Sequence, residues 1–588
     1  MRKFLLILAA SAALFAGSAF AELPRVAGEP AWVNEKAAAA QSAARKARLS
    51  NVPVADVAQV SFGPMAESRI YELRMNNARA VNKALQVGIH RDLRAEGMNA
   101  QQPALNWRSL PNGGVAARFA VTSPGARAMR LALNFRDIAA GAELRFLGVN
   151  DEDSVVAVVR GEEVANLRRE QPLYWTPVTE GETQTVEIYL PAGAASRPRF
   201  TVDTVAHLIV APWGKLTGAK IGESDSCEVD VVCISPPPAA FTSAKNAVAR
   251  MTYTAACGAN GALATCVCTG TLLNDMDTTT QIPYFYGANH CIGTQTEAST
   301  LTTFWFYEST GCGSGVLGTN TQVAGGGTLL YADHAKDGML MRLNNAPPSG
   351  AYFGGWDSAL IAAGTSFTVI HHPAGDVKKV SLGQILGFTT LQDTGGNFIT
   401  VGYTNATTEG GSSGSGLLTS DSNGAYYLRG GLFAGPALCS NSGNLNDTNN
   451  RDYYSRFDQV YPSISQYLAA AAAQPDYTGV WNNANEDGWG LSVFRGASSG
   501  IYGIIMYHYN QSGSPTWYFM SGGSFNGNVY SANVLLFSGP FFGGPYSAAT
   551  HPSVGTVTIN FTSATTATLS YTIGNTPVSN KSIAKYIF

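Results

Sequence analysis

The chain has 588 residues, a formal net charge of −3 and charged side chains at 13% of its positions, so no basic surface for nucleic acid is expected. Its length suffices for roughly three to four domains. Glycine is abundant, with 63 residues, and many serine, threonine, asparagine and tyrosine residues accompany it, which favours turn-rich β-structure over helices.

The N-terminus predicts a secretory signal peptide over residues 1–21. Arg2 and Lys3 precede an almost wholly apolar run, and small residues around Ala21 offer a cleavage site. The alternative is a membrane anchor, but the run is shorter than the roughly 20 residues that a spanning helix needs. We therefore expect a secreted protein that has no attachment to the membrane after signal cleavage.

Residues 22–220 form the next predicted region. Up to about residue 60 they are rich in alanine, which predicts helical or loose structure. From about Ile70 to Ala211, short alternating apolar runs separated by turn residues predict a small β-sandwich. The clearest of these runs cover residues 115–121, 129–135, 144–149 and 185–190.

Residues 221–470 again combine short strand-like runs with glycine-rich turns, and residues 461–468 predict a closing helix. An alanine run over 469–473, followed by Gln474 and Pro475, predicts a linker. Residues 475–588 predict a small β domain rich in aromatic residues. Those aromatic side chains either fill its core or form a platform for glycan or cell-wall contact, and the sequence leaves both readings open.

All eight cysteines lie between Cys227 and Cys439. An even set in an exported chain predicts disulfide bonds. A zinc site is the alternative, but one residue separates Cys266 from Cys268, whereas zinc knuckles use about two to four. We expect no metal and no cofactor.

Ser413 is the candidate nucleophile. It lies in a glycine- and serine-rich segment, residues 408–416, in which a tight turn would aim the amides of Gly411 and Ser413 at one point. A serine hydroxyl needs a base before it can attack. Alone, such a segment is more typical of a flexible loop.

His290 and Asp337 supply the partners that this serine needs. His290 follows an apolar, strand-like run and stands beside Cys291, and Asp337 precedes another strand-like run. The chain order histidine, aspartate, serine is typical of the chymotrypsin group.

Other residues compete for these roles less well. His371 and His372 lack the pattern of a zinc peptidase and are interpreted as structural. His334 is interpreted as a loop residue, and Asp333 lacks the apolar alternation that follows Asp337.

With these motifs in place, residues 221–468 resemble the bacterial lysyl endopeptidases, which are secreted serine proteases. The resemblance implies a mainly β fold with a chymotrypsin-like double β-barrel, action on protein or peptide substrates through an acyl-enzyme, His290 as base, Asp337 as its orienting carboxylate, and Gly411 and Ser413 as oxyanion hole. Two departures are Gly287 to Asn289 before the histidine and Gly338 after the aspartate. The matching segments are Ser226 to Cys233, Cys268 to Asn274, Gly355 to Asp357, Ile370 to Pro373 and Glu409 to Ser415.

The same resemblance implies how the cysteines pair. It implies the bonds Cys227–Cys439, Cys233–Cys312 and Cys268–Cys291, which leaves Cys257 and Cys266 for each other.

Substrate preference depends on a buried carboxylate, because a desolvated lysine ammonium is costly unless it is paired. The position that trypsins use is Thr407 here, so the resemblance points instead to Asp452. The alternative is that Asp452 is an exposed loop residue. Thr408, Phe433 and Gly435 are the other expected substrate-binding residues.

The N-terminal region is expected to act on the protease domain. The resemblance makes residues 22–220 a propeptide, a folding aid and inhibitor, with maturation near Lys220 and Ile221. The residue before the nucleophile is Ser412, so a freed amino terminus cannot pair with a carboxylate there as in chymotrypsin-like zymogens.

Two functions therefore remain from the sequence. One is a serine endopeptidase that cleaves after lysine. The other is a weakly active or inactive protease scaffold that serves adhesion or binding through its C-terminal domain. The complete set of His290, Asp337 and Ser413 favours the enzyme.

Overall fold

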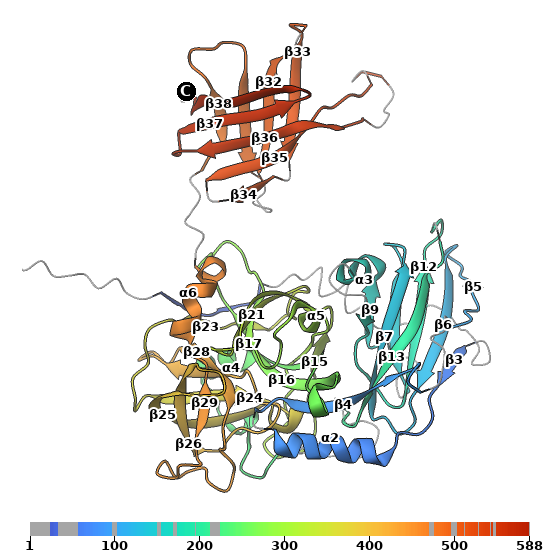
Figure 1. The fold of residues 1–588 in the computed structure, drawn as a ribbon, viewed down its shortest axis with the longest axis vertical. Coiled ribbons are helices and arrows are strands. Elements are labelled where there is room, and N and C mark those ends of the chain that lie inside the picture. The colour runs from blue at the N-terminus through green and yellow to red at the C-terminus, as the bar shows by residue number, and fades with distance from the viewer. Residues whose placement is uncertain are drawn as a thin grey trace, which may run out of the picture. The chain divides into compact units, whose positions relative to one another are not determined.

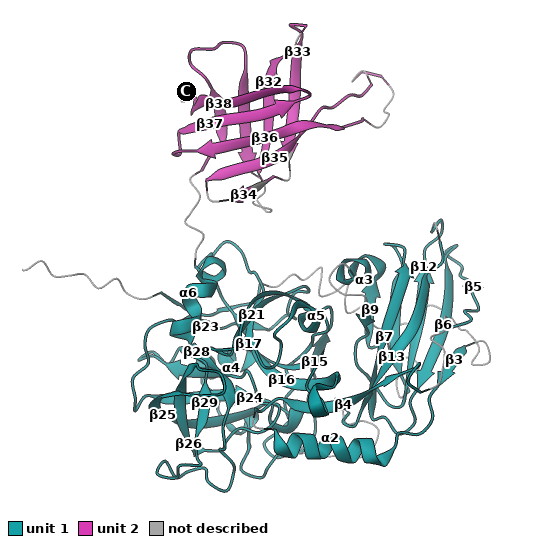
Figure 2. Cartoon of the chain, in the orientation of Figure 1, with its two compact units in different colours: residues 1–469 teal, residues 470–588 magenta. Residues whose placement is uncertain are grey.

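The structure is a computed structural model, and it divides into two compact units, residues 1–469 and 470–588 (Figure 2). The predicted signal peptide, the expected maturation point at Lys220 and nearly all of the predicted linker lie outside the described residues. The described residues are 24–32, 57–80, 82–96, 103–149, 155–168, 173–194, 196–211, 224–469, 476–495, 502–510, 512–521, 523–526, 528–540, 543–544 and 549–586.

Two packed sheets build the N-terminal part of the first unit (Figure 1). One sheet has the order β3-β6-β12-β8-β9, and the other contains β10, β7, β13 and β4 in that order. The bounds are β3 Ala58–Ser61, β4 Leu85–Asp92, β6 Val115–Thr122, β7 Ala128–Asp137, β8 Glu143–Gly148, β9 Ala157–Arg160, β10 Tyr174–Trp175, β12 Thr183–Leu190 and β13 Arg199–Leu208.

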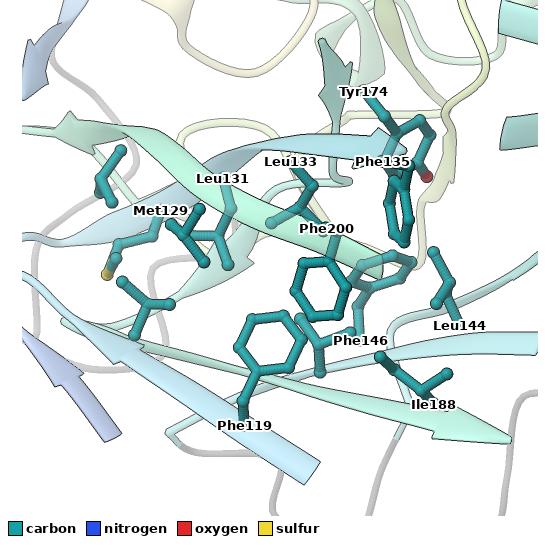
Figure 3. Packing of buried hydrophobic residues seen from close by; sticks show 14 of the residues in the cluster. Phe119, Met129, Leu131, Leu133, Phe135, Leu144, Phe146, Tyr174, Ile188 and Phe200 are labelled. Carbon is teal, nitrogen blue, oxygen red and sulfur yellow. The ribbon is translucent and has the colours of Figure 1, made fainter. Parts of the chain in front are cut away.

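Large apolar side chains fill the space between these sheets. Phe119 on β6 packs against Phe200 on β13, with ring centroids 5.1 Å apart, and Phe135 on β7 packs on the same ring (Figure 3). Each of the three rings is at most 1% exposed, so this layer is a continuous hydrophobic core.

The start of the chain differs from the expectation of helical or loose structure. Strands β1 (Arg25–Val26) and β2 (Glu29–Pro30) pair with β23 (Gly355–Asp357) and β22 (Tyr352–Phe353) of the protease part. The helix α2 (Glu67–Arg79) also lies in a region for which only strands were expected.

The protease part, within residues 224–469, contains two strand assemblies. In the first, the order is β19-β18-β15-β16-β17-β21-β20; in the second, β24-β25-β26-β29-β28-β27 closes into a barrel, because β27 pairs with β24. The expected mainly β, chymotrypsin-like fold is thus confirmed. The bounds are β15 Val248–Ala255, β16 Ala264–Leu273, β17 Tyr284–Ala288, β18 Thr302–Trp305, β19 Thr321–Val323, β20 Gly327–Asp333, β21 Gly338–Leu343, β24 Ser366–His371, β25 Lys379–Thr390, β26 Asn397–Asn405, β27 Gly416–Ser420, β28 Tyr426–Ala434 and β29 Asp452–Tyr454.

Helix α6 (Phe457–Leu468) closes the protease part and includes the helix expected over residues 461–468. Its Phe457, Val460, Ile464 and Leu468 are fully buried in the protease core. The i, i+3, i+4 spacing of these residues gives the helix one apolar face.

Disulfide bonds join the cysteines of this part in four pairs. They are Cys227–Cys439, Cys233–Cys312, Cys257–Cys266 and Cys268–Cys291. The last bond ties β16 to the residue next to His290.

Strand β4 links the N-terminal sheet to the protease part. One of its edges pairs with β13 and the other with β16, so that a single sheet continues from one part into the other (Figure 1). Beside this junction lies one apolar cluster to which both parts contribute. Its buried members are Val87, Ala128, Ala132, Trp175, Val178, Ala206, Leu208, Val267, Phe304, Tyr307 and Val377.

The second unit is a single antiparallel sheet in the order β33-β32-β31-β30-β38-β37-β36-β35-β34. Tyr477 and Trp481 are buried in its core, whereas Tyr507, Tyr509 and Trp517 are about half exposed. The bounds are β30 Gly479–Asn482, β31 Gly490–Arg495, β32 Tyr502–Tyr509, β33 Pro515–Ser521, β34 Ser524–Asn526, β35 Val529–Leu535, β36 Ser553–Phe561, β37 Thr566–Ile573 and β38 Thr576–Lys585.

Among the described residues, no helix combines the length and the apolar character needed to cross a membrane.

Candidate active site

The pairing of two strands brings the predicted histidine and aspartate together. His290 follows β17 and Asp337 immediately precedes β21, and these strands are antiparallel neighbours with Ala288 opposite Gly338. Residues that are far apart in sequence therefore emerge at the same edge of the sheet. Ser413 reaches this edge from the turn before β27.

The three side chains form a hydrogen-bonded chain. Asp337 Oδ2 lies 2.9 Å from His290 Nδ1, and His290 Nε2 lies 2.6 Å from Ser413 Oγ. The His290 amide also donates to Asp337 Oδ1 at 2.9 Å, which fixes the carboxylate from a second side. A serine, a base and an orienting carboxylate in this arrangement can carry out acyl transfer.

The loop before Ser413 directs two amides at one oxygen. The amides of Gly411 and Ser413 donate to the backbone carbonyl of Lys83, at N···O distances of 2.6 and 3.3 Å. Gly411 has φ +97°, and a Cβ atom there would lie 2.6 Å from the His372 carbonyl oxygen, so only glycine fits. This is the donor pair that the sequence assigns to an oxyanion hole.

Side chains within the protease part support this loop. Ser412 Oγ lies 2.8 Å from His371 Nδ1 and accepts from the Glu409 amide at 3.1 Å. His371 is fully buried, and burial together with the charges of Lys83 and Lys379 lowers the pKa of His371 to about 3. A neutral ring therefore stabilises the loop where chymotrypsin-like zymogens need a new ion pair.

Asp452 lies at the end of a closed pocket and is 0% exposed. The Tyr403 hydroxyl donates to its Oδ2 atom at 2.8 Å, and Thr408 Oγ1 donates to the same atom. Burial and the Asp452 charge raise the pKa of Tyr403, which keeps its hydroxyl a donor. The alternative of an exposed loop aspartate does not describe this residue.

Lys83, from the N-terminal part, fills the pocket. Its Nζ atom lies 2.9 and 2.8 Å from the two oxygens of Asp452. The ammonium also donates to Thr408 Oγ1 at 2.6 Å, to the Thr408 carbonyl at 2.8 Å and to the Ala437 carbonyl at 3.3 Å. Sequence reasoning missed this residue. A lysine just before an apolar strand was the available signal, but nothing local distinguishes it from other lysines of the region.

Gly435 and Phe433 form other parts of the pocket's surroundings. At Gly435 (φ +155°) a Cβ atom would lie 2.3 Å from Asp452 Oδ1. The Phe433 ring meets the His290 ring edge to face, with centroids 5.7 Å apart, and stacks on Phe398 at 4.9 Å. Phe433 therefore contacts the histidine, and Gly435 leaves room beside the carboxylate.

Two clusters of the described residues have the side-chain types that bind metals. One contains His290 with Cys268 and Cys291, and the other contains Asp225, Glu409 and Cys439. The cysteines of both clusters are in disulfide bonds, so their sulfur atoms are not thiolate ligands.

Comparison with known proteins gives matches over most of the first unit. Residues 61–209 match the family model described as the lysyl endopeptidase N-terminal domain, and residues 221–455 match the lysyl endopeptidase C-terminal domain. The lysyl endopeptidase of Pseudomonas aeruginosa is 35% identical over 394 residues, which is 66% of this chain and 81% of that protein.

Solved protease structures are more distant. The active form of the Rv3671c protease from M. tuberculosis covers 40% of this chain and 86% of its own, with 14% identity and a TM-score of 0.26. An HtrA-type protease with a decapeptide covers 39% of this chain and 66% of its own, with 16% identity and a TM-score of 0.27.

Proposed function

Because this chain belongs to the lysyl endopeptidase family and is a serine endopeptidase that acts on protein or peptide substrates, we propose that it cleaves on the C-terminal side of lysine. We assign catalysis to His290, Asp337 and Ser413. One observation carries the proposal: a lysine ammonium pairs with Asp452 while the carbonyl of the same lysine accepts from Gly411 and Ser413.

The chemistry of the pocket supports lysine as the preferred residue. A buried carboxylate offsets the several kcal/mol that desolvation of an ammonium costs. The acceptors around Lys83 Nζ converge on one point, which suits a compact ammonium better than the planar fork of arginine.

The proposed reaction follows from the geometry. Ser413 Oγ attacks the carbonyl carbon of the substrate lysine while His290 Nε2 takes the hydroxyl proton. The amides of Gly411 and Ser413 stabilise the oxyanion, and His290 then gives the proton to the leaving amine. Water hydrolyses the acyl-enzyme by the same route, and Asp337 holds the imidazole in the required tautomer.

Export and maturation belong to the same proposal. Residues 1–21 act as a signal peptide of a secreted protein, residues 22–220 as its propeptide, residues 221–470 as the protease domain and residues 475–588 as a C-terminal β domain. On that last domain, Tyr507 and Trp517 face each other across β32 and β33, with Tyr509 two residues further on. These exposed aromatic side chains favour contact with glycan or the cell wall.

The alternative of a weakly active or inactive binding scaffold is less well supported. A scaffold has no need of a serine, histidine and aspartate in hydrogen-bonding order beside two converging amides.

The test combines two substitutions with product profiling. Ser413→Ala should abolish hydrolysis with the fold intact. Asp452→Asn should lower kcat/KM for a lysine substrate about 100-fold or more, because the ammonium loses its buried partner, and should affect a methionine substrate far less.

Asp447→Asn, in the same loop and with the same loss of charge, is the matched control and should retain activity. A product set from a denatured protein mixture without lysine before the cut would refute the specificity. Near-normal turnover by Ser413→Ala would refute the nucleophile.

A further inference from the structure

The N-terminal domain occupies the active site as a substrate would. We propose that the Lys83–Ala84 peptide bond is the reactive bond of a built-in, substrate-like inhibitor, with Lys83 in the lysine pocket and Ala84 on the leaving side. This proposal rests on the proposed function, since it uses the same pocket and the same nucleophile.

The chain before this bond is bound by its backbone as well as by the lysine side chain. Asn82 forms an antiparallel bridge with Ala434, in the segment next to Phe433. The Lys83 carbonyl accepts from both Gly411 and Ser413, which puts its carbon beside the nucleophile. The lysine side chain is only 7% exposed. The bond is therefore in a reactive setting and is not simply covered.

The chain after the bond is bound even more extensively. Strand β4 begins at Leu85, which pairs with Val267 of β16, and Gln86 pairs with Cys266. On its other edge β4 pairs with β13 inside the N-terminal domain. The Asn77 side chain also exchanges hydrogen bonds with the Gln86 backbone at 2.8 and 3.0 Å, tying the strand to α2.

This support affects the fate of the bond. Attack by Ser413 Oγ on the Lys83 carbonyl carbon forms an ester, breaks the C–N bond and transfers the serine proton through His290 to the Ala84 nitrogen. The new amine stays beside the ester, because β4 is paired along both edges. It can therefore attack the ester and re-form the peptide bond before water releases the Lys83 carboxylate. Cleavage is slow and reversible, as an inhibitor requires.

The catalytic apparatus beneath the plug is already assembled. The loop around Ser412 is stabilised by His371, and the triad atoms are within hydrogen-bonding distance. The precursor is therefore kept inactive by occupation of the site and not by a disordered nucleophile loop.

The first test measures access to Ser413 in the full chain with a fluorophosphonate probe. Lys83→Gln should label at least about tenfold faster than the wild-type precursor, since an unpaired Asp452 weakens the plug. Arg79→Gln is the control: Arg79 is an exposed basic residue at the end of α2, four positions before Lys83, and this change should alter labelling less than about twofold.

The second test examines the bond itself. Acid-quenched wild-type precursor should contain a minor, constant fraction with a new N-terminus at Ala84, whose two fragments copurify until they are denatured. Ser413→Ala should contain none. Rapid, complete cleavage at this bond, or equal labelling of Lys83→Gln and wild type, would overturn the proposal.

The failure of the plug and the failure of the proposed function are distinguishable. A mature enzyme that cuts after lysine while Lys83→Gln labels no faster refutes only the plug. A mature enzyme without lysine preference refutes the pocket assignment, whatever the labelling rates of the precursors.

Discussion

At the scale of single residues, the pocket depends on a charge that has no contact with water. Asp452 is fully buried, and its oxygens are shared among Lys83, Thr408 and Tyr403. Removing one partner from such a group costs more than its hydrogen bond, because the remaining charge stays buried. Small changes beside this carboxylate should therefore have large effects on specificity.

Gly435→Ala is the smallest such change. The added Cβ would stand 2.3 Å from Asp452 Oδ1, in a backbone conformation (φ +155°) that side chains rarely adopt. We expect kcat/KM for lysine substrates to fall about 100-fold or more, because the carboxylate or its strand must move. Steady-state kinetics on matched lysine and methionine peptides measures the effect.

Gly443→Ala is the control for this substitution. Gly443 also has positive φ (+86°), but the nearest atom to its added Cβ would be the Thr404 carbonyl oxygen at 3.9 Å. It should lose some stability and keep its specificity. Equal kinetic losses in both variants would contradict the steric argument at Gly435.

Sequence and structure reach different depths at this scale. His290, Asp337 and Ser413 could be proposed from chain order and flanking glycines, since these patterns are local. Lys83 could not, because its partner Asp452 lies 369 positions away and no local pattern encodes that contact. It is one of five lysines in residues 22–220, and the sequence does not rank them.

At the scale of elements, β4 has two roles that its sequence does not reveal. Its alternating apolar residues predict a strand, yet not that both edges are used by different parts of the chain. The helix α2 was missed for a related reason: Leu73 is its only fully buried residue among those described, so it lacks the apolar stripe that predicts a helix.

Acid should loosen the contact that β4 makes. His90 Nε2 lies 3.1 Å from Thr265 Oγ1 of the protease part, and its ring lies against Trp175. Burial, with the nearby Arg130 charge, lowers the pKa of His90 to about 3. A free histidine has a pKa of about 6.5 and so binds a proton more readily.

Between those two values, falling pH therefore favours the undocked state, by up to about tenfold per pH unit. Probe labelling of the precursor, divided by that of the mature enzyme at each pH, should rise between about pH 7 and pH 5. His90→Gln should flatten this rise. An identical slope in wild type and His90→Gln would exclude His90 as the cause.

At the scale of the whole molecule, the two units have separate cores. The core of the second unit runs from Tyr477 to Ile583 and takes no residue from the first. The protease core, by contrast, includes α6 up to Leu468. The chain should therefore tolerate truncation between these positions and nowhere shortly before.

A chain that ends at Gln474 should cleave a short lysine peptide with kcat/KM within about twofold of the full protein, because no described contact of the site is lost. A chain that ends at Arg456 should fail to fold, since it lacks Phe457, Val460, Ile464 and Leu468. Thermal unfolding and peptide hydrolysis compare the two. Inactivity of the longer truncation would show that the C-terminal domain supports catalysis.

The strand β4 that joins the two parts of the first unit also has a kinetic consequence. While the chain is continuous, the plug is tethered to the site at an effective concentration on the order of millimolar, independent of how dilute the protein is. Once the connection between residues 211 and 224 is cut, the plug becomes an ordinary ligand whose rebinding depends on its bulk concentration. Dilution outside the cell then acts as a timer: the protease stays silent while crowded and becomes active as it spreads.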